Sequence, residues 1–325
     1  MKKSRFLVLA ALTALSFASC NRNETTTNDL PKGEVKGKIG MTCMDLTNPF
    51  FKLIANIMEE EASKVGYELI AADGAKDAAV QNAQVADFIA QKCSAIFLNP
   101  ADSKAAAESV RKAHEAGIPV FTFDVQIGEE EARKLVTSHI GSDNFQGGQL
   151  AGESMMKATN NQGKIAIISL PEISSCIFRV DGFRDYLAKN GGKLEVVAEL
   201  SGKGNRNDGY SVASDILQAN SDIVGIFAVN DPSALGAAEA VAKANASDRI
   251  TIVGFDASPS GKQGVFEKKL YDTPQQFPRK MAEGTVAAFV KYLDGDAVEK
   301  SILIPCEHYY HEDSVKDESR EKEQW

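Results

Sequence analysis

Short apolar runs rich in β-branched residues recur along the chain, and each precedes a longer stretch whose apolar positions keep helical spacing. A continuous apolar run, unlike an alternating one, is typical of a strand that is buried on both faces of a parallel sheet. The pattern predicts eight such strands, at Lys38–Cys43, Tyr67–Ala71, Ala95–Leu98, Pro119–Phe123, Lys164–Ser169, Leu194–Glu199, Ile223–Val229 and Ile250–Phe255.

The stretches between these runs predict helices. After the first run, Phe51, Ile54, Met58 and Val65 keep the spacing of one helical face, and the acidic triplet Glu59–Glu61 falls mostly off it. Strand–helix alternation in two consecutive sets favours an α/β protein with two doubly wound parallel-sheet lobes. The charged, aperiodic segment 312–325 predicts a frayed tail.

The first twenty residues predict export. Lys2, Lys3 and Arg5 precede an apolar stretch that is too short to span a bilayer, and small residues then precede Cys20. This ending resembles the lipobox of bacterial lipoproteins, in which the cysteine is acylated, so we expect a signal peptide over 1–19 and lipidation of Cys20. The alternative is an ordinary cleaved signal with a coincidental cysteine. The polar segment that follows, to residue 37, predicts a flexible tether.

Composition narrows the class of protein. The chain has 36 Lys and Arg against 45 Asp and Glu, a net charge of −9, which argues against a nucleic-acid partner because neutralising phosphates needs clustered basic residues. Five cysteines and four histidines are too few for a disulfide-rich or metal-cluster scaffold. Four of the cysteines lack CxxC spacing, and the sequence leaves open whether any of them pair. We expect these four to be buried free thiols: Cys43, Cys93, Cys176 and Cys306.

The loops after the strands carry the candidate chemistry, because ligands of doubly wound sheets bind at the carboxyl ends of the strands. Aromatic rings there can stack on the CH faces of a sugar, while carboxylates, amides and a guanidinium bind its hydroxyls. The residues concerned are Asn48, Phe50, Phe51, Asp124, Arg179, Asn230 and Asp256. Singly each has a structural explanation, and Asp231 is expected to cap a helix. Their joint pattern predicts a small polyhydroxylated ligand.

Eight short segments, taken in their order along the chain, support this interpretation. They are TNPFF, FLNPADS, IPVFTFD, SHIGSDNFQGGQLAGE, RVDGF, FAVNDPSALGA, VGFDASP and QQFP. From about Lys38 to Ile304 the chain resembles the ribose-binding-type periplasmic sugar-binding proteins of ABC transporters, the type I periplasmic binding proteins. That family shares its fold with sugar-responsive bacterial repressors.

The resemblance implies a ligand set, position by position. Asn48, Phe50, Phe51 and Asp124 would contact the sugar from the first lobe, and the second lobe and a hinge crossing would contribute Arg179, Asn230, Asp256 and Gln276. Two positions depart from the ribose pattern. Val125 stands where the family has an arginine, and Gly204 or Asn205 stands where it has a second-lobe aromatic, for which Phe178 is the candidate replacement. The expected ligand is therefore a monosaccharide or polyol, with ribose itself in question.

The resemblance also implies how the protein works. The first lobe would comprise 38–141 and 277–305, and the second 142–276 and 306–311, joined by three crossings near 139–142, 275–277 and 305–307. Hinge closure would bury the sugar and present both lobes to an ABC permease. We expect a monomer exported to the periplasm or cell surface, held to a membrane only through Cys20, with no cofactor, metal or catalytic residue.

Other functions fit the sequence less well. Dinucleotide-binding GxGxxG, phosphate-binding GxxxxGK[ST] and the GxSxG nucleophile elbow do not occur at the required places. Asp124 and Asp256 could form a glycosidase pair, but binding chemistry explains both carboxylates. A transcription factor would carry a helix-turn-helix where this chain has an export signal. A lipoprotein that passes its ligand to a membrane sensor stays open. The alternation of a final strand over SILIP would scatter the side chains of Cys306–His311, which argues against a metal site there.

Overall fold

The first of two parallel sheets is built from the N-terminal half of the chain and one late strand. The structure, a computed structural model, describes residues 35–321. The strand order in this sheet is β10-β5-β4-β3-β1-β2. The bounds are β1 (Gly37–Cys43), β2 (Tyr67–Asp73), β3 (Ala95–Asn99), β4 (Val120–Phe123), β5 (Ser138–Ser142) and β10 (Ser301–Ile304). The strand predicted over SILIP is therefore present, and it pairs in parallel with β5.

The second sheet has the order β7-β6-β8-β9 and is also parallel throughout. Its strands are β6 (Gly163–Ser169), β7 (Leu194–Ser201), β8 (Ile223–Ala228) and β9 (Thr251–Val253). β9 is shorter than the predicted run because the chain leaves the ladder at Gly254, whose N–H donates to the Asp272 carbonyl. We call each sheet with its helices a lobe, so that the prediction of two doubly wound lobes is confirmed.

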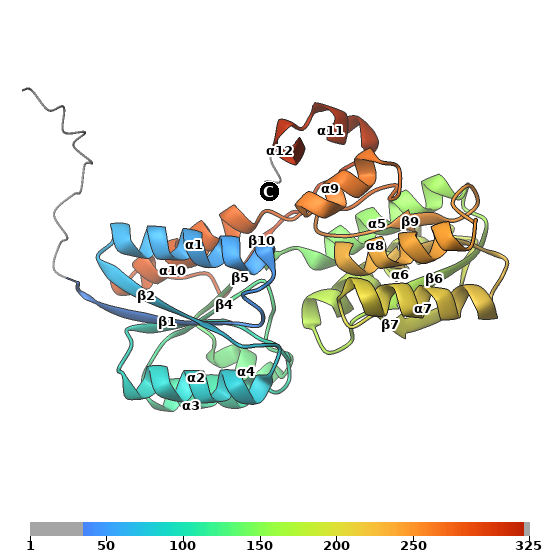
Figure 1. Ribbon diagram of the computed structural model, residues 1–325. Coiled ribbons are helices and arrows are strands. Elements are labelled where there is room, and N and C mark those ends of the chain that lie inside the picture. The colour runs from blue at the N-terminus through green and yellow to red at the C-terminus, as the bar shows by residue number, and fades with distance from the viewer. Residues whose placement is uncertain (1–34, 322–325) are drawn as a thin grey trace, which may run out of the picture. The chain divides into compact units, whose positions relative to one another are not determined.

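Helices cover both faces of each sheet, as Figure 1 shows. In the first lobe α1 (Pro49–Lys64) and α10 (Pro278–Leu293) lie on one face, and α2 (Ala78–Ala90), α3 (Ala107–Glu115) and α4 (Glu130–Leu135) on the other. In the second lobe α5 (Asn144–Ala158) and α6 (Ser174–Lys189) lie opposite α7 (Arg206–Ala219), α8 (Asp231–Lys243) and α9 (Pro259–Phe266).

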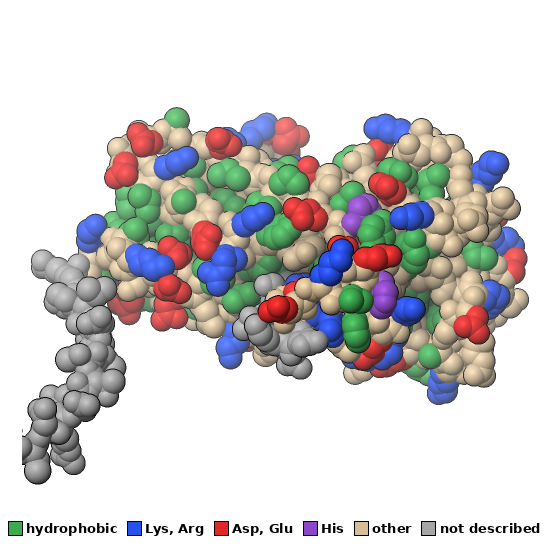
Figure 2. All heavy atoms as spheres, turned by 90° about the horizontal axis from the view of Figure 1, so that it is seen from above, with side chains coloured by type: hydrophobic (Ala, Val, Ile, Leu, Met, Phe, Trp, Pro, Cys, Tyr) green, Lys and Arg blue, Asp and Glu red, His purple; other side chains and the backbone are tan. Residues whose placement is uncertain are grey.

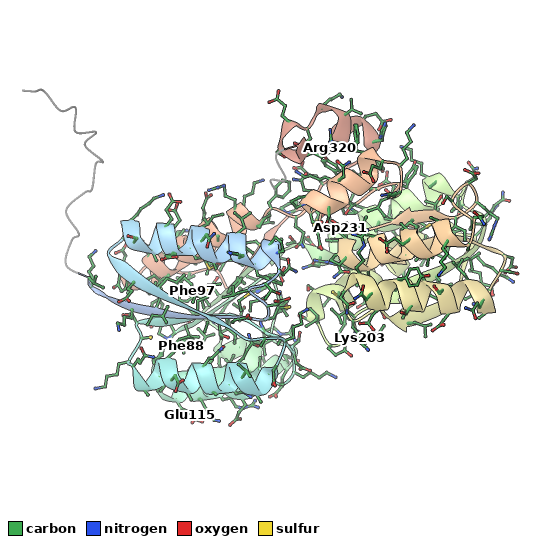
Figure 3. The ribbon with its side chains drawn as sticks, in the orientation of Figure 1. Phe88, Phe97, Glu115, Lys203, Asp231 and Arg320 are labelled. Carbon is green, nitrogen blue, oxygen red and sulfur yellow. The ribbon has the colours of Figure 1, made fainter. Side chains whose placement is uncertain are left out.

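Two apolar layers per lobe follow from this arrangement. Phe97 of β3 is fully buried in the layer under α1 and α10, and Phe88 of α2 fills the layer on the opposite face, as Figure 3 shows. Alternate residues of a strand point to opposite faces, so a strand covered on both sides must be apolar at every position. This is why the buried strands appear in the sequence as continuous apolar runs.

The chain crosses between the lobes three times. It leaves the first lobe after β5, returns between β9 and α10, and crosses again after β10. The Asp143 N–H donates to the Ile304 carbonyl over 2.8 Å, and the Gln275 N–H donates to the Glu307 carbonyl over 2.7 Å. The first and second crossings are therefore each hydrogen-bonded to the third, which forms the predicted three-crossing hinge.

The C-terminal segment differs from the prediction. Instead of a frayed tail, α11 (His311–Lys316) and α12 (Glu318–Glu321) pack on α9. Lys262 of α9, with a side chain only 3% exposed, pairs with Asp317 over 2.9 Å, and the Arg320 guanidinium lies 3.8 Å from the centre of the Phe266 ring. We call α11 and α12 together the C-terminal appendage, and Figure 3 shows Arg320 on it. The prediction is wrong for 312–321 because tertiary contacts with α9, and not an apolar stripe, stabilise these helices. Residues 322–325 lie outside the described part.

The surface carries both signs of charge. Figure 2 shows basic and acidic side chains interspersed on the face that it draws. Within residues 35–321, no helix is long and apolar enough to cross a membrane. The predicted signal peptide, Cys20 and most of the tether lie outside the described residues.

Candidate functional site

A cavity of about 530 Å³ is lined by residues from both lobes. It receives the ends of several strands, where the rule for doubly wound sheets places a ligand. The structure brings all eight residues of the predicted ligand set to it: Asn48, Phe50, Phe51, Asp124, Arg179, Asn230, Asp256 and Gln276.

The first lobe contributes an apolar wall at the start of α1. The Asn48 side chain caps this helix, because its Oδ1 accepts the Phe50 N–H over 3.0 Å, and Pro49 suits the first helical position. The cap fixes the start of the helix, where the rings of Phe50 and Phe51 meet edge to face with centroids 5.2 Å apart. Phe50 and Phe51 are only 5% and 7% exposed, so they belong to the core and also line the cavity.

Asp124 lies directly after β4 with a φ of 60°, a left-handed conformation that costs energy for a residue with a side chain. Its Oδ2 accepts from the Asn99 amide over 3.3 Å, whereas its Oδ1 is buried without a hydrogen-bond partner. Burial raises the pKa of this carboxyl to about 6, although the nearby charge of Arg179 opposes the rise. A buried acceptor without a partner is costly unless a ligand satisfies it.

Arg179 of α6 is 3% exposed and held on several sides. Its Nη1 donates to the Val229 carbonyl over 2.7 Å and to Asp256 Oδ1 over 2.9 Å, and its Nε donates to Asn144 Oδ1 over 2.8 Å. The guanidinium stacks on Phe255, 3.8 Å from the ring centre. These contacts use Nε and Nη1 and leave Nη2 as the donor for the cavity.

Asp256 follows β9 with a φ of 110°, so the second lobe has a strained aspartate like that of the first. Its Oδ1 also accepts from Gln276 Nε2 over 2.7 Å, and Gln276 Oε1 is buried without a partner. Burial raises the pKa of the Asp256 carboxyl, and Arg179 opposes this. The site thus contains a buried guanidinium that is paired with Asp256 and lies near the charge of Asp124, with acceptors available for ligand hydroxyls.

Asn230 has a structural role that the sequence assigned to its neighbour. Asn230, and not Asp231, caps α8, because its Oδ1 accepts the Ser233 N–H over 3.1 Å. Asp231 is fully buried behind the site, where its carboxylate accepts from the Ser258 N–H and hydroxyl and from the Thr273 hydroxyl. Figure 3 shows its position in the second lobe. Asp231 therefore secures the loop that presents Asp256.

The two departures from the ribose pattern have different structural outcomes. Val125 is fully buried among second-lobe core residues and does not line the cavity. Gly204 does line it, with a φ of 66°, and a Cβ there would lie 3.1 Å from Leu170 Cδ2. Phe178 lines two other cavities, one of which shares Asp124 with this one, so its stacking role stays a prediction. The aliphatic side chain of Leu170 lines the cavity beside Gly204.

Sequence reasoning missed two lysines at the cavity. Lys76 follows β2 and pairs with Asp45 over 3.1 Å, and Lys203 follows β7 and pairs with Asp208 over 3.3 Å. Figure 3 shows Lys203 on the second lobe. The strand-end rule could have found both, because each lies in the turn directly after a strand of its lobe.

The histidines near the C-terminus bind protein groups. His308 Nδ1 lies 2.7 Å from Asp272 Oδ2, which also accepts from the Ser154 hydroxyl over 2.5 Å. Among residues 35–321, no group of three or more histidines, cysteines and acidic residues could hold a metal ion. Four cysteines are free and buried there: Cys43, Cys93, Cys176 and Cys306.

The fold and the site define a class, that of two-lobed binding proteins with one ligand cavity between parallel-sheet lobes. The chain belongs to the family described as the periplasmic binding protein domain, whose model matches residues 39–297. The members of this family bind ligands and do not act as enzymes, as we predicted for this chain. Membership also implies an extracytoplasmic location.

Similar proteins have been described in several bacteria. The ribose import binding protein of Escherichia coli is 34% identical over 81% of this chain and 87% of its own, and that of Bacillus subtilis is 33% identical over 82% and 85%. Among solved structures, a solute binding protein from Bacillus halodurans with bound myo-inositol has a TM-score of 0.81 at 29% identity, covering 89% of this chain and 99% of its own. One from Actinobacillus succinogenes with bound D-allose has a TM-score of 0.79 at 27% identity, covering 87% and 100%.

Proposed function

We propose that this protein binds one monosaccharide or polyol in the cavity between its lobes and delivers it to an ABC permease outside the cytoplasm. The observation that carries the proposal is the shared cavity, in which Phe50 and Phe51 lie with a buried ion pair and two unpartnered buried oxygens. Relatives named for ribose import and neighbours with bound myo-inositol or D-allose support the ligand class.

Each lining residue has a role in this proposal. The two phenylalanines contact the CH faces of the ring, because an aromatic face excludes water from apolar CH groups while the hydroxyls point elsewhere. Asp124 and Asp256 accept hydrogen bonds from hydroxyls, and Arg179 donates to them. The side-chain amides of Asn48, Asn230 and Gln276 line the same cavity and offer further donors and acceptors to the hydroxyls.

Closure of the lobes around the ligand would complete the site. The lobes in this proposal comprise 38–141 with 277–305, and 142–276 with 306–311. The three crossings between them are short, so a few residues can absorb the bend, and the first and second are each hydrogen-bonded to the third. A ligand that contacts both lobes binds the closed form better than the open one, so it shifts the population toward closure.

Anchoring is part of the same proposal. Residues 1–19 would be removed as a signal peptide, Cys20 would be lipidated, and the following polar segment would link the anchor to a monomeric two-lobed body. The protein would then stay at a membrane of the periplasm or cell surface while its body captures the sugar.

A thermal-shift screen tests the ligand class. A ligand that binds only the folded state raises the melting temperature, by an amount that grows with ligand concentration above its dissociation constant. We expect at least one sugar or polyol from a panel that includes D-ribose, D-allose and myo-inositol to raise it, and to raise it further as its concentration is increased. Amino acids and short peptides serve as negative controls. A shift from one of those and from no sugar would contradict the proposal.

A further inference from the structure

The first turn of α5 lies where the chain first crosses between the lobes, and its side chains reach both the hinge and the site. Asp143 caps the helix by accepting the Gln146 N–H over 3.0 Å. The next residues belong to the segment GSDNFQ, for which the proposed function assigns no role. Two of their side chains make contacts that an ordinary helix start does not need.

Gln146 binds the third crossing at two points. Its Nε2 donates to the Cys306 carbonyl over 3.2 Å, and the Cys306 N–H donates to its Oε1 over 2.9 Å. The amide side chain thus pairs with both backbone groups of one residue, as a neighbouring strand would. With the bond from the Asp143 N–H to the Ile304 carbonyl, this fixes α5 to the third crossing.

Asn144 connects the same turn to the ligand-facing guanidinium. Its Oδ1 accepts from Arg179 Nε over 2.8 Å, and its Nδ2 donates to the Ser142 carbonyl over 3.1 Å. The side chain is 6% exposed, and its two partners fix which end of the amide faces which way. Asn144, which directly follows the first crossing, therefore fixes the orientation of the Arg179 guanidinium.

Backbone packing makes this connection rigid. A Cβ on Gly148 of α5 would lie 2.1 Å from the Arg179 carbonyl oxygen, and one on Gly182 of α6 would lie 2.0 Å from the Phe145 carbonyl oxygen. The two helices therefore touch backbone to backbone where they carry Asn144 and Arg179. Close-packed interiors transmit displacements, so the first turn of α5 and the Arg179 segment move together.

We propose that Asn144 and Gln146 are positioning residues that couple the hinge to Arg179. Gln146 transmits the position of the third crossing to the first turn of α5, and Asn144 transmits it to the guanidinium. The coupling itself is a property of the ligand-free protein, and its effect on sugar selectivity rests on the proposed function.

Hydrogen exchange of the Arg179 Nε–H tests the coupling without any ligand. NMR of arginine-labelled protein, with the signal assigned through Arg179→Lys, would compare the wild type with Gln146→Met and Gln149→Met. Gln149 is the matched control, since it is half-buried on the same helix and its Nε2 donates to Asp185, away from the hinge. Losing the two hydrogen bonds to Cys306 should speed the exchange at least about tenfold in Gln146→Met. It should stay within about twofold of the wild type in Gln149→Met.

Two variants at position 144 complete the test. Asn144→Asp keeps the acceptor for Arg179 Nε and should keep the slow exchange, whereas Asn144→Leu removes it and should abolish the protection. Equal exchange rates in Gln146→Met and Gln149→Met would overturn the proposal, as would slow exchange in Asn144→Leu. Melting curves of each variant confirm that it is folded before the rates are compared.

Calorimetry across several sugars separates the two residues once a ligand is known. Gln146→Met should weaken every sugar and change their rank order less than Asn144→Leu does, because it loosens Arg179 only indirectly. Asn144→Leu removes the hydrogen bond that orients the guanidinium. Asn144→Asp should restore the rank order of the wild type. An unchanged rank order in Asn144→Leu would overturn the effect on selectivity. If the wild type binds no sugar, the proposed function fails and the exchange rates alone decide the coupling.

Discussion

Asp124 and Asp256 occupy matching places in the two lobes, and the ligand-free protein is less stable for having them. Both follow a strand with a positive φ, Asp124 is buried and Asp256 half-buried, and desolvation raises the pKa of both carboxyls. Groups held in this way persist at binding sites because the surrounding structure imposes them. At these two positions stability and binding should therefore respond in opposite directions to the same substitution.

Replacing Asp124 with asparagine should show this opposition. Folding raises the pKa of the Asp124 carboxyl from its ordinary value of 3.8 to about 6. The contribution of Asp124 to stability is therefore full below pH 3.8 and is lost as the pH rises through 6. Asp124→Asn should therefore stabilise the ligand-free protein at pH 8 by up to about 3 kcal/mol and have little effect near pH 4. Urea unfolding at both pH values measures this, with the exposed Glu115→Gln as control. Equal effects at the two pH values would contradict it.

Val125 tests whether the missing arginine of the ribose pattern can be restored. The position is fully buried against the second-lobe core, so Val125→Arg would place an unpaired guanidinium among apolar side chains. We expect a loss of about 3 to 5 kcal/mol in the free energy of unfolding. The same substitution at Val80, which is 38% exposed, should cost no more than about 0.5 kcal/mol. A stable Val125→Arg protein that binds ribose more tightly than the wild type does would refute this account of the position.

At the scale of elements, the sequence predicted what periodicity or a strand end encodes. Buried strands such as Lys164–Ser169 appear as continuous apolar runs, and Asp124 and Asp256 were found because they directly follow such runs. α11 and α12 were missed because their stabilising partner, Lys262, is 55 residues before Asp317 in the sequence. The Asn144–Arg179 contact was missed for the same reason, since no periodicity relates the two positions.

The C-terminal helices predict a specific loss of stability. Although burial alone would raise it, hydrogen bonds from Ser319, Lys262 and Tyr309 hold the pKa of Asp317 well below its usual range. Asp317→Asn leaves the buried Lys262 ammonium without its counter-charge and should cost about 3 kcal/mol at neutral pH. Glu131→Gln, which breaks an exposed pair with Lys134, should cost at most about 0.5 kcal/mol. Urea unfolding compares the two, and equal losses would show that the appendage contributes little.

At the scale of the whole molecule, short hydrogen-bonded crossings join two lobes around one cavity, and the N-terminal segment would keep that body at a membrane. The sequence could predict the number of crossings only through its family resemblance, because a crossing has no periodicity of its own. Their mutual hydrogen bonds, such as that between Gln275 and Glu307, appear only in three dimensions.

Cys20→Ser should release the protein from membranes if the cysteine carries the lipid. A lipid anchor gains about 0.8 kcal/mol for each buried CH₂ group, and no span within residues 35–321 could replace it. Membrane and soluble fractions of cells that express either form would be compared by immunoblot, with Cys93→Ser as the control. Equal membrane association of the two variants would contradict lipidation.

Calorimetric titration of the best sugar from the thermal-shift panel tests the central claim most directly. The account predicts one sugar per wild-type chain and affinity about 100-fold weaker in Asp256→Asn, which removes a charged hydrogen-bond acceptor from the cavity. Glu115→Gln, on the outer surface of the first lobe, should bind as the wild type does. Equal affinity of the wild type and Asp256→Asn for the sugar would contradict binding between the lobes.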